Sequence, residues 1–218
     1  GAWRSTVVDR RQDPALDGEL MSASLGLLHG TRDVIITSPL MILRSEALLA
    51  EVGLDVGDKG EVKLERLGAH PELIDLLGLR WLLSVHDLTP LGYSRINDPE
   101  SAVGVFENVD PLPSGFLVGC ARQVESPLEA LLTLDPRESA IVETETSLPD
   151  CDSGARVGRV QTVEVSPTEL RFEVESDTAS LLVDNRTWYP GWEAQLDGKS
   201  VPVIRTDLAF RGVEVPEG

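Results

Sequence analysis

The stretch DNRTWYPGWEAQLDGKSVPV, residues 184–203, decides how the C-terminal part of this chain folds. Aromatic residues make up only 5% of the 218-residue chain, yet Trp188, Tyr189 and Trp192 lie within five positions around a Pro-Gly pair. Such crowding is typical either of a structural corner or of a binding surface. The residues on both sides of the stretch show which architecture surrounds it.

Turn chemistry divides the stretch into short strands. Pro190 fixes φ and Gly191 permits positive φ, so these residues predict a tight corner between two strands. Apolar and polar residues then alternate from 192 to 197, which is typical of a half-buried strand. Asp197-Gly198 is a hairpin turn signal, and the return strand follows it.

The same alternation extends upstream. Leu170, Phe172 and Val174 alternate with charged residues, which places one face of a strand on a core and the other in water. Further strands are predicted at SLLVD (180–184) and FRGVEV (210–215). The sequence therefore predicts an antiparallel β-sandwich-like module over residues 157–218.

Residues 1–118 follow a different pattern, in which helical stretches alternate with buried strands. DVIIT (33–37) and LRWLLSV (79–85) are predicted strands, and helices are expected before Gly53 and from Pro71 to Gly78. This alternation predicts a mixed α/β module. Residues 119–156 are predicted to connect the two modules through a helix, which a Ser126 capping box opens, and a long loop. The expected fold class is α+β, with the α/β module first and the sandwich-like module second.

Charge limits the partners. The chain carries 19 Lys and Arg against 37 Asp and Glu, a formal net charge of −18. Nucleic-acid binding requires a basic surface that releases phosphate counterions, so no nucleic-acid partner is expected. The uncharged stretches fall short of the roughly 20 apolar residues that a membrane-spanning helix needs. The acidic, lysine-poor composition fits a protein adapted to concentrated salt, or is merely an arginine-biased acidic composition.

No catalytic or metal-binding pattern is present in the sequence. His29, His70 and His86 lack the helical spacing of a zinc pair. No nucleophile, base and orienting group occur together at a usable spacing, and no phosphate-loop or dinucleotide motif occurs. We therefore expect no catalytic residue, no metal and no cofactor in this chain, and an independent hydrolase activity has almost no support.

Cys120 and Cys151 are the two cysteines. A disulfide between them would close a moderate loop and contribute on the order of 3 kcal/mol in an oxidising compartment. The alternative is two unrelated thiols, and spacing alone favours neither.

The corner also carries a resemblance. Together with two upstream blocks it resembles the YfhO family of multi-pass membrane proteins. The corner block ends in a Val-Pro pair and an Arg-x-x-x-x-Phe-Arg-x-Val strand, and Trp188 stands where the family usually has tyrosine. The upstream blocks are LIDLLGLRWLLS (73–84) and VFENVDPLPSGFLV (105–118), the second with Ser-Gly in place of Arg-Ala.

The resemblance implies where this domain lies in a parent protein and what that protein does. The family is related to glycosyltransferases that use polyprenyl-phosphate sugars, so the parent protein would be such an enzyme of cell-envelope glycans, with its catalytic residues among membrane helices. This chain is similar to the extracytoplasmic domain near the C-terminus, which a final strand and a membrane helix usually follow. Its partner would be the membrane-spanning remainder of the same polypeptide, and its location the extracytoplasmic face of the cell membrane.

Two functional hypotheses remain open at this stage. The first is a non-catalytic accessory domain that binds an envelope glycan; its candidate residues are Trp188, Tyr189, Trp192, Arg205 and Arg211. The second is a purely structural or protein-interaction module with no ligand, in which Pro190, Gly191, Asp197 and Gly198 only set turns. The sequence favours a mainly structural corner whose rings close the sandwich core. Fully covered rings would support the second hypothesis.

Overall fold

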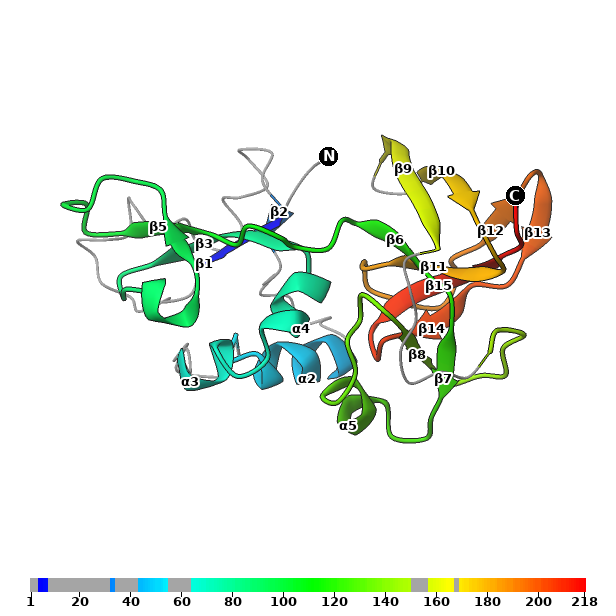
Figure 1. Cartoon of the computed structure of the whole chain (residues 1–218), viewed down its shortest axis with the longest axis horizontal. Coiled ribbons are helices and arrows are strands. Elements are labelled where there is room, and N and C mark those ends of the chain that lie inside the picture. Colours follow the sequence, from blue (N-terminus) through cyan, green and yellow to red (C-terminus); the bar gives the residue numbers. More distant parts are fainter. Residues whose placement is uncertain (1–3, 8–31, 34–42, 55–63, 150–156, 167–168) are drawn as a thin grey trace. The chain divides into compact units, whose positions relative to one another are not determined.

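The computed structural model describes residues 4–7, 32–33, 43–54, 64–149, 157–166 and 169–218 (Figure 1). Both helices and sheets are present, so the chain is α+β, and sheets predominate. It forms two compact units, Gly1–Leu112 and Pro113–Gly218.

The first unit is built on a five-stranded mixed sheet with the order β2-β1-β3-β5-β4. Strand β1 pairs in parallel with β2 and β3, whereas β5 pairs antiparallel with β3 and β4. The strands are β1 (Arg4–Val7), β2 (Arg32–Asp33), β3 (Leu79–Ser84), β4 (Ser94–Arg95) and β5 (Gly104–Glu107). Of the predicted strand 33–37, only Asp33 lies within the described residues.

Within the described part of this unit, three short helices accompany the sheet: α2 (Leu43–Glu51), α3 (Leu64–Leu67) and α4 (Pro71–Leu76). Gly53 and Gly78 follow α2 and α4 with φ of 76° and 68°, the left-handed conformation in which helices commonly end. A 3₁₀ turn, η1 (Thr89–Leu91), precedes β4. The side chains at the centre of this unit are fully buried and almost all aliphatic: Leu48, Leu67, Leu73, Ile74, Leu76, Leu79, Leu82 and Phe106.

Polar contacts join the α4–β3 segment to the end of β5. Arg80 Nη2 donates to Glu107 Oε1 at 2.9 Å. Asn108 Nδ2 donates both to Asp75 Oδ1 at 2.7 Å and to the Leu79 carbonyl at 3.0 Å. The sequence blocks 73–84 and 105–118 therefore meet in space, because Asn108 and Glu107 bridge back to α4 and β3.

The second unit is built on a six-stranded sheet with the order β6-β11-β15-β14-β8-β7. All neighbouring strands pair antiparallel except β7 and β8, which are parallel. Its strands are β6 (Gly115–Val118), β7 (Ala121–Gln123), β8 (Ala140–Val142), β11 (Ser180–Asp184), β14 (Ile204–Thr206) and β15 (Phe210–Val215).

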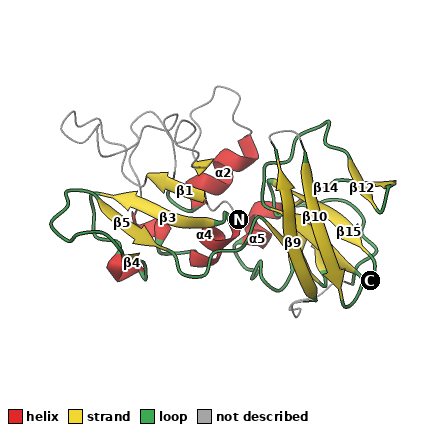
Figure 2. Ribbon diagram, turned by 90° about the horizontal axis from the view of Figure 1, so that it is seen from above, coloured by secondary structure: helices red, strands yellow, loops and turns green. Residues whose placement is uncertain are grey.

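Two hairpins complete this unit. Strands β9 (Gly158–Val165) and β10 (Leu170–Ser176) form one, and β12 (Ala194–Leu196) and β13 (Lys199–Val201) form the other. Figure 2 shows β9 and β10 as adjacent long strands over the sheet that contains β14 and β15. Apolar side chains of β9 and β10 pack on the buried sheet residues Leu117, Leu182 and Val215. Burial on the inward face explains the alternation that the sequence shows in β10.

The sequence placed the end of the first module at Val118 and a connector at 119–156. In the structure the second unit starts at Pro113, because β6 pairs with β11 rather than with any strand of the first unit. Strands β7 and β8 of the supposed connector belong to the six-stranded sheet.

Helix α5 (Pro127–Leu131) starts where predicted, but Ser126 makes no side-chain cap hydrogen bond, so no capping box forms. Residues 38–42, in the stretch before Gly53 where a helix is expected, lie outside the described residues.

Candidate binding site: the arginine–tryptophan corner

The corner (residues 188–192) lies between β11 and β12. Gly191 has φ of 104°, a conformation that favours glycine, as the sequence predicts. The Trp188 amide donates to the Ala209 carbonyl at 2.7 Å, which fastens the corner to the turn between β14 and β15. The backbone of the corner is thus set both by its own residues and by a neighbouring turn.

The aromatic rings of the corner are incompletely covered. Trp188 and Trp192 are half-buried, and Tyr189 is 46% exposed. The Tyr189 and Trp192 ring centroids lie 5.5 Å apart with a tilt of 57°, a favourable aromatic pair. Since fully covered rings were the mark of a purely structural corner, this exposure leaves a surface that a ligand can reach.

Two arginines lie under the tryptophans. Arg205 on β14 is the direct cross-strand neighbour of Arg211 on β15, so both side chains leave the same face of the sheet. The Arg205 guanidinium carbon is 4.1 Å from the Trp188 ring centroid, and that of Arg211 is 4.0 Å from the Trp192 centroid. Both distances suit cation–π stacking. The two tryptophan rings therefore stack on guanidinium groups.

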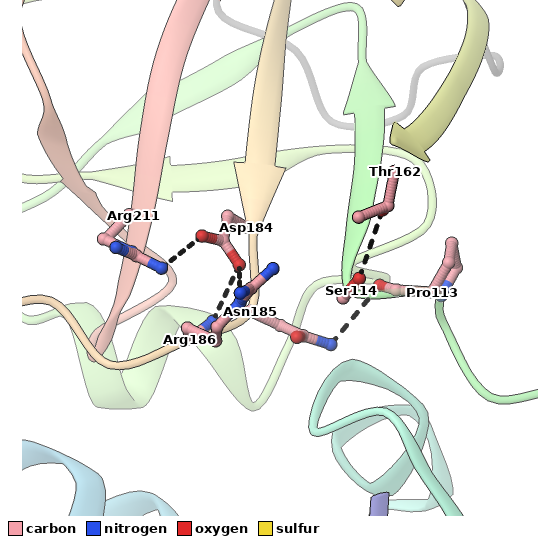
Figure 3. Close-up of polar contacts among 7 residues, drawn as sticks. All are labelled: Pro113, Ser114, Thr162, Asp184, Asn185, Arg186 and Arg211. Atoms are coloured by element: carbon pink, nitrogen blue, oxygen red, sulfur yellow. Dashed lines mark hydrogen bonds and ion pairs between the residues drawn. The ribbon is translucent and has the colours of Figure 1, made fainter. Parts of the chain in front are cut away.

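A carboxylate balances the more deeply buried arginine (Figure 3). Asp184 accepts hydrogen bonds from Arg211 Nη2 through Oδ2 and from Arg186 Nε, at 3.0 Å, through Oδ1. Burial lowers the pKa of the Arg211 guanidinium below its ordinary value, and the charge of Asp184 opposes that shift. Arg205 is more exposed and forms a looser ion pair with Glu143 at 3.5 Å.

Asn185, next to Asp184, ties the end of β11 to the segment before β6, and Ser114 of that segment contacts Thr162 of β9. Asn185 Nδ2 donates to the Pro113 carbonyl at 3.3 Å, and the Ser114 and Thr162 hydroxyls lie 3.5 Å apart (Figure 3). These contacts hold the backbone from which Asp184 and Arg186 extend. Asp184 and Arg186 therefore extend from a backbone segment that is hydrogen-bonded to the residues before β6.

Three N–H groups around Asp184 have no acceptor within the part of the chain that the structure describes: Arg186 Nη2, Trp192 Nε1 and Arg211 Nε. All three are donors. All three atoms are buried, so a ligand at the exposed Tyr189 ring would reach them only after a side-chain movement. Acid–base or nucleophilic chemistry would need a different set of groups.

Other residues singled out in the sequence have simpler roles. Asp197 and Gly198 have φ of 50° and 76° in a two-residue turn between β12 and β13, the geometry of a type I′ hairpin. Cys120 is disulfide-bonded, and Cys151, the other cysteine of the sequence, lies outside the described residues. His70 Nδ1 contacts Glu72 Oε1 at 3.2 Å.

Sequence reasoning missed three polar residues near the corner. Asp184 and Arg186 were not candidates, although Asp184 sits at the end of an apolar strand, where a charge needs a partner. Asp207 is fully buried in the turn between β14 and β15. Burial raises its pKa to about 7, against the opposing effect of the hydrogen bond from the Ile141 amide. Nothing in the local sequence marks a buried carboxyl there.

Comparison with protein-family models, with curated proteins and with solved structures finds no match for this chain. Among the described residues, no helix has the length and apolarity required to cross a bilayer. The same residues contain no group of three or more His, Cys, Asp or Glu side chains placed to hold a metal ion.

Proposed function

We propose that this chain is a non-catalytic, extracytoplasmic accessory domain of a membrane-embedded glycosyltransferase-like protein, and that its second unit binds an envelope glycan at the corner. The resemblance of the corner and the two upstream blocks to the YfhO family supports the placement. The structure supports the binding role through a single observation. Tyr189 presents an exposed ring beside Trp192, and the arginines beneath the corner hold the tryptophans in place.

The chemistry of the corner fits a saccharide. The apolar face of a sugar ring stacks on an aromatic ring, and its hydroxyl oxygens accept hydrogen bonds from N–H groups at the edge. Tyr189 offers the ring, and the Arg205 side chain, 28% exposed, offers donors at the rim. The Arg205 pair with Glu143 is loose and solvent-reachable, so an oxygen-rich ligand could share that guanidinium.

A second candidate function is a structural or protein-interaction module with no ligand. The observation that favours it is the depth of Arg211, which is 5% exposed and is held by Asp184 and Trp192. Under this function the corner only completes the sandwich-like packing of the second unit. The exposed Tyr189 would then have no role of its own.

Glycan titration of the chain separates the two functions. The change in tryptophan fluorescence would be recorded while a panel of neutral and acidic envelope polysaccharides is added to the parent chain and to two variants. Tyr189→Ala removes the exposed ring, and we expect it to weaken binding by roughly tenfold, since a ring-stacking contact contributes on the order of 1 kcal/mol.

Val163→Ala is the matched control. Val163 is 47% exposed, on β9 of the same unit, so the truncation removes an equally exposed side chain outside the corner. Unchanged binding in this control, with loss in Tyr189→Ala, supports the glycan site. If no polysaccharide in the panel binds the parent chain, or if both variants bind equally well, the structural module is the better description.

A further inference from the structure

A cleft of about 830 Å³ extends from the corner along the second unit, a size within the range of roughly 300 to 1,000 Å³ that is typical of ligand sites. Its floor is the face of the six-stranded sheet that carries Leu182, Val213 and Val215. Trp192 stacks on Arg211, four residues before Val215 on β15, so the corner lies at one end of this floor.

The floor is longer than a single ring. Strand β15 extends about 13 Å from Arg211 to Val215, at roughly 3.3 Å per residue. Six-membered rings in contact have centroids about 4.5 to 7 Å apart, so the floor has room for about two to three linked rings. The exposed Tyr189 ring at the corner offers a place for one more. A site of this length suits a chain of linked sugars better than a single sugar.

One wall of the cleft is the outer edge of β10, which offers backbone groups. The Ser176 amide and carbonyl bond to Gly218, at 2.8 and 3.0 Å, and Ser176 faces β9 on its other side. Residues two apart on a strand direct their backbone groups to the same side, so the N–H and C=O of Val174 and Phe172 also face the outer edge. Within the described residues, β10 forms a ladder with β9 alone. The wall therefore provides both hydrogen-bond donors and acceptors.

The side chains around this edge are apolar. Phe172 and Val174 pack against the cluster that includes Leu182 of the floor. Ala194 and Leu196 of β12 are half-buried and line the opposite side. Such a lining suits a ligand with apolar ring faces and with hydroxyl groups, which both donate and accept hydrogen bonds. A polysaccharide has both features at every residue.

The ionised groups that line the cleft provide no excess positive charge. Asp184 neutralises Arg211, and Glu169 pairs with Arg171 at 3.3 Å. Glu193 is exposed and adds a negative charge at the rim. The whole chain has a formal net charge of −18, so its field repels a polyanion. The charges therefore favour an uncharged ligand.

We propose that the cleft binds a linear, uncharged glycan chain, with one sugar residue on Tyr189 and two or three more along the floor. The sugar rings lie with an apolar face on Leu182 and Val213, and their hydroxyl groups bond to the edge of β10. A peptide strand would use the same edge, but the exposed Tyr189 ring at the end of the floor favours the glycan. This inference rests on the proposed function and deepens it, because it names the class of glycan and extends the site beyond the corner.

A length series of the glycan tests this extent. Acid hydrolysis would cut the neutral polysaccharide of the panel that binds most tightly into fragments of one to six residues, and each fragment would be titrated against the parent chain by tryptophan fluorescence. Affinity should rise by roughly tenfold or more from one residue to three, and should be constant from four to six. Equal affinity at all lengths would overturn the inference and leave the corner as a glycan site. Absence of binding by every polysaccharide would overturn the proposed function itself.

Charge is tested on the same polysaccharide backbone. Carboxymethylation of the bound polysaccharide adds carboxylates without changing its linkages. We expect it to weaken binding by roughly tenfold at low ionic strength, and by less in concentrated salt, because salt screens the repulsion. Equal or tighter binding of the carboxymethylated form, or binding of acidic polysaccharides alone, would contradict an uncharged ligand.

Two enlarged side chains locate the glycan in the cleft. Ala194→Phe fills space between β12 and the floor, so fragments of three or more residues should bind no better than a single residue. Ala179→Phe is the matched control, because Ala179 is exposed and does not line the cleft, and the gain with length should remain. Thermal unfolding verifies that both variants fold. An unchanged gain with length in folded Ala194→Phe would place the glycan elsewhere.

Amide hydrogen exchange in the parent chain needs no variant. A four-residue fragment should slow exchange of the Val174 amide by roughly tenfold, whereas a single sugar residue should not. The Glu173 and Glu175 amides face β9 and serve as internal controls, with exchange unchanged. If a seven-residue peptide of alternating Val and Thr slows exchange at Val174 and the glycan fragments do not, the edge binds a polypeptide and the inference is wrong.

Discussion

Two turns of the second unit contact each other but differ in burial and in the residues that adopt positive φ. The corner at residues 188–192 is partly exposed and obtains its positive φ from Gly191. The turn between β14 and β15 is buried, and its positive φ values, 46° and 69°, fall on Asp207 and Leu208. The Trp188 amide joins the two by its bond to the Ala209 carbonyl.

The difference shows which turn serves the fold. Non-glycine residues at positive φ cost of order 1 kcal/mol or more each, so the surrounding contacts must hold them there. Asp207 supplies such contacts: its Oδ1 accepts from the Ile141 amide at 2.8 Å, and its own amide donates to the Ile141 carbonyl at 2.8 Å. The buried turn ties β14 to β8, whereas the corner rests on it and keeps a free surface.

The largest expected effect is the pH dependence that Asp207 gives to the free energy of unfolding. Its pKa in the folded chain is about 7, above the ordinary value of 3.8, so the folded state retains a proton that the unfolded chain loses. The free energy of unfolding should therefore fall as pH rises from about 4 to about 7, by on the order of 4 kcal/mol in total. Urea unfolding at several pH values measures this slope.

Asp207→Asn isolates that contribution. The amide keeps an oxygen for the Ile141 N–H and cannot ionise, so the fall across this pH range should become smaller than in the parent chain. Asp177→Asn is the control, because Asp177 is exposed and its replacement removes the same formal charge. Equal slopes in the parent chain and in Asp207→Asn would show that the buried carboxyl does not control the stability of the turn.

The next effect concerns the acid beneath the corner. Asp184→Ala leaves Arg211 buried beside Trp192 without its carboxylate, and an uncompensated buried charge costs about 3 kcal/mol. Glu143→Ala removes the partner of Arg205, whose side chain is 28% exposed, and should cost less than about 1 kcal/mol. Chemical denaturation of both variants tests whether the stability of the corner depends on the ion pair of the buried Arg211. Similar losses of unfolding free energy in the two variants would argue that it does not.

The sequence predicted the features of the second unit that depend only on adjacent residues. Asp197-Gly198 forms the expected hairpin, and Gly191 has the expected positive φ, because turn preferences are properties of a few adjacent residues. The alternation in β10 likewise has the expected buried face. These features need no knowledge of distant segments.

The contacts that define the site could not be predicted in this way. Arg205 and Arg211 are neighbours only because the buried turn sets the register of β14 on β15. Val118 was placed in the first module because a strand pattern does not identify its pairing partner, β11. Asp207 could not be found because a single aspartate in a turn is normally solvated. Long-range register and burial decide all three, and neither is encoded in a short stretch.

Trp192→Ala tests how much the ring of the corner contributes to the stability of the fold. A fully buried tryptophan would cost about 3 to 5 kcal/mol on truncation. Trp192 is only half-buried, and its ring stacks on the Arg211 guanidinium at 4.0 Å, so a loss of about 2 kcal/mol is expected. Trp192→Phe keeps a ring over the guanidinium and should lose less. A loss above 4 kcal/mol in the alanine variant would support the expectation that the ring closes the core.

The smallest expected effect tests the backbone of the corner. An added Cβ at Gly191 or at Gly198 would meet no atom within 4 Å, so any cost of an alanine there comes from φ alone. Gly198, with φ of 76°, lies close to the left-handed region that other residues enter, whereas Gly191, with φ of 104°, lies beyond it. We therefore expect Gly191→Ala to cost between about 1 and 2 kcal/mol and Gly198→Ala to cost nearer 1 kcal/mol. Thermal unfolding of the pair measures the difference. If Gly191→Ala unfolds at the parent temperature, the corner adjusts its backbone freely, and the ring–arginine stacks alone hold the tryptophans in place.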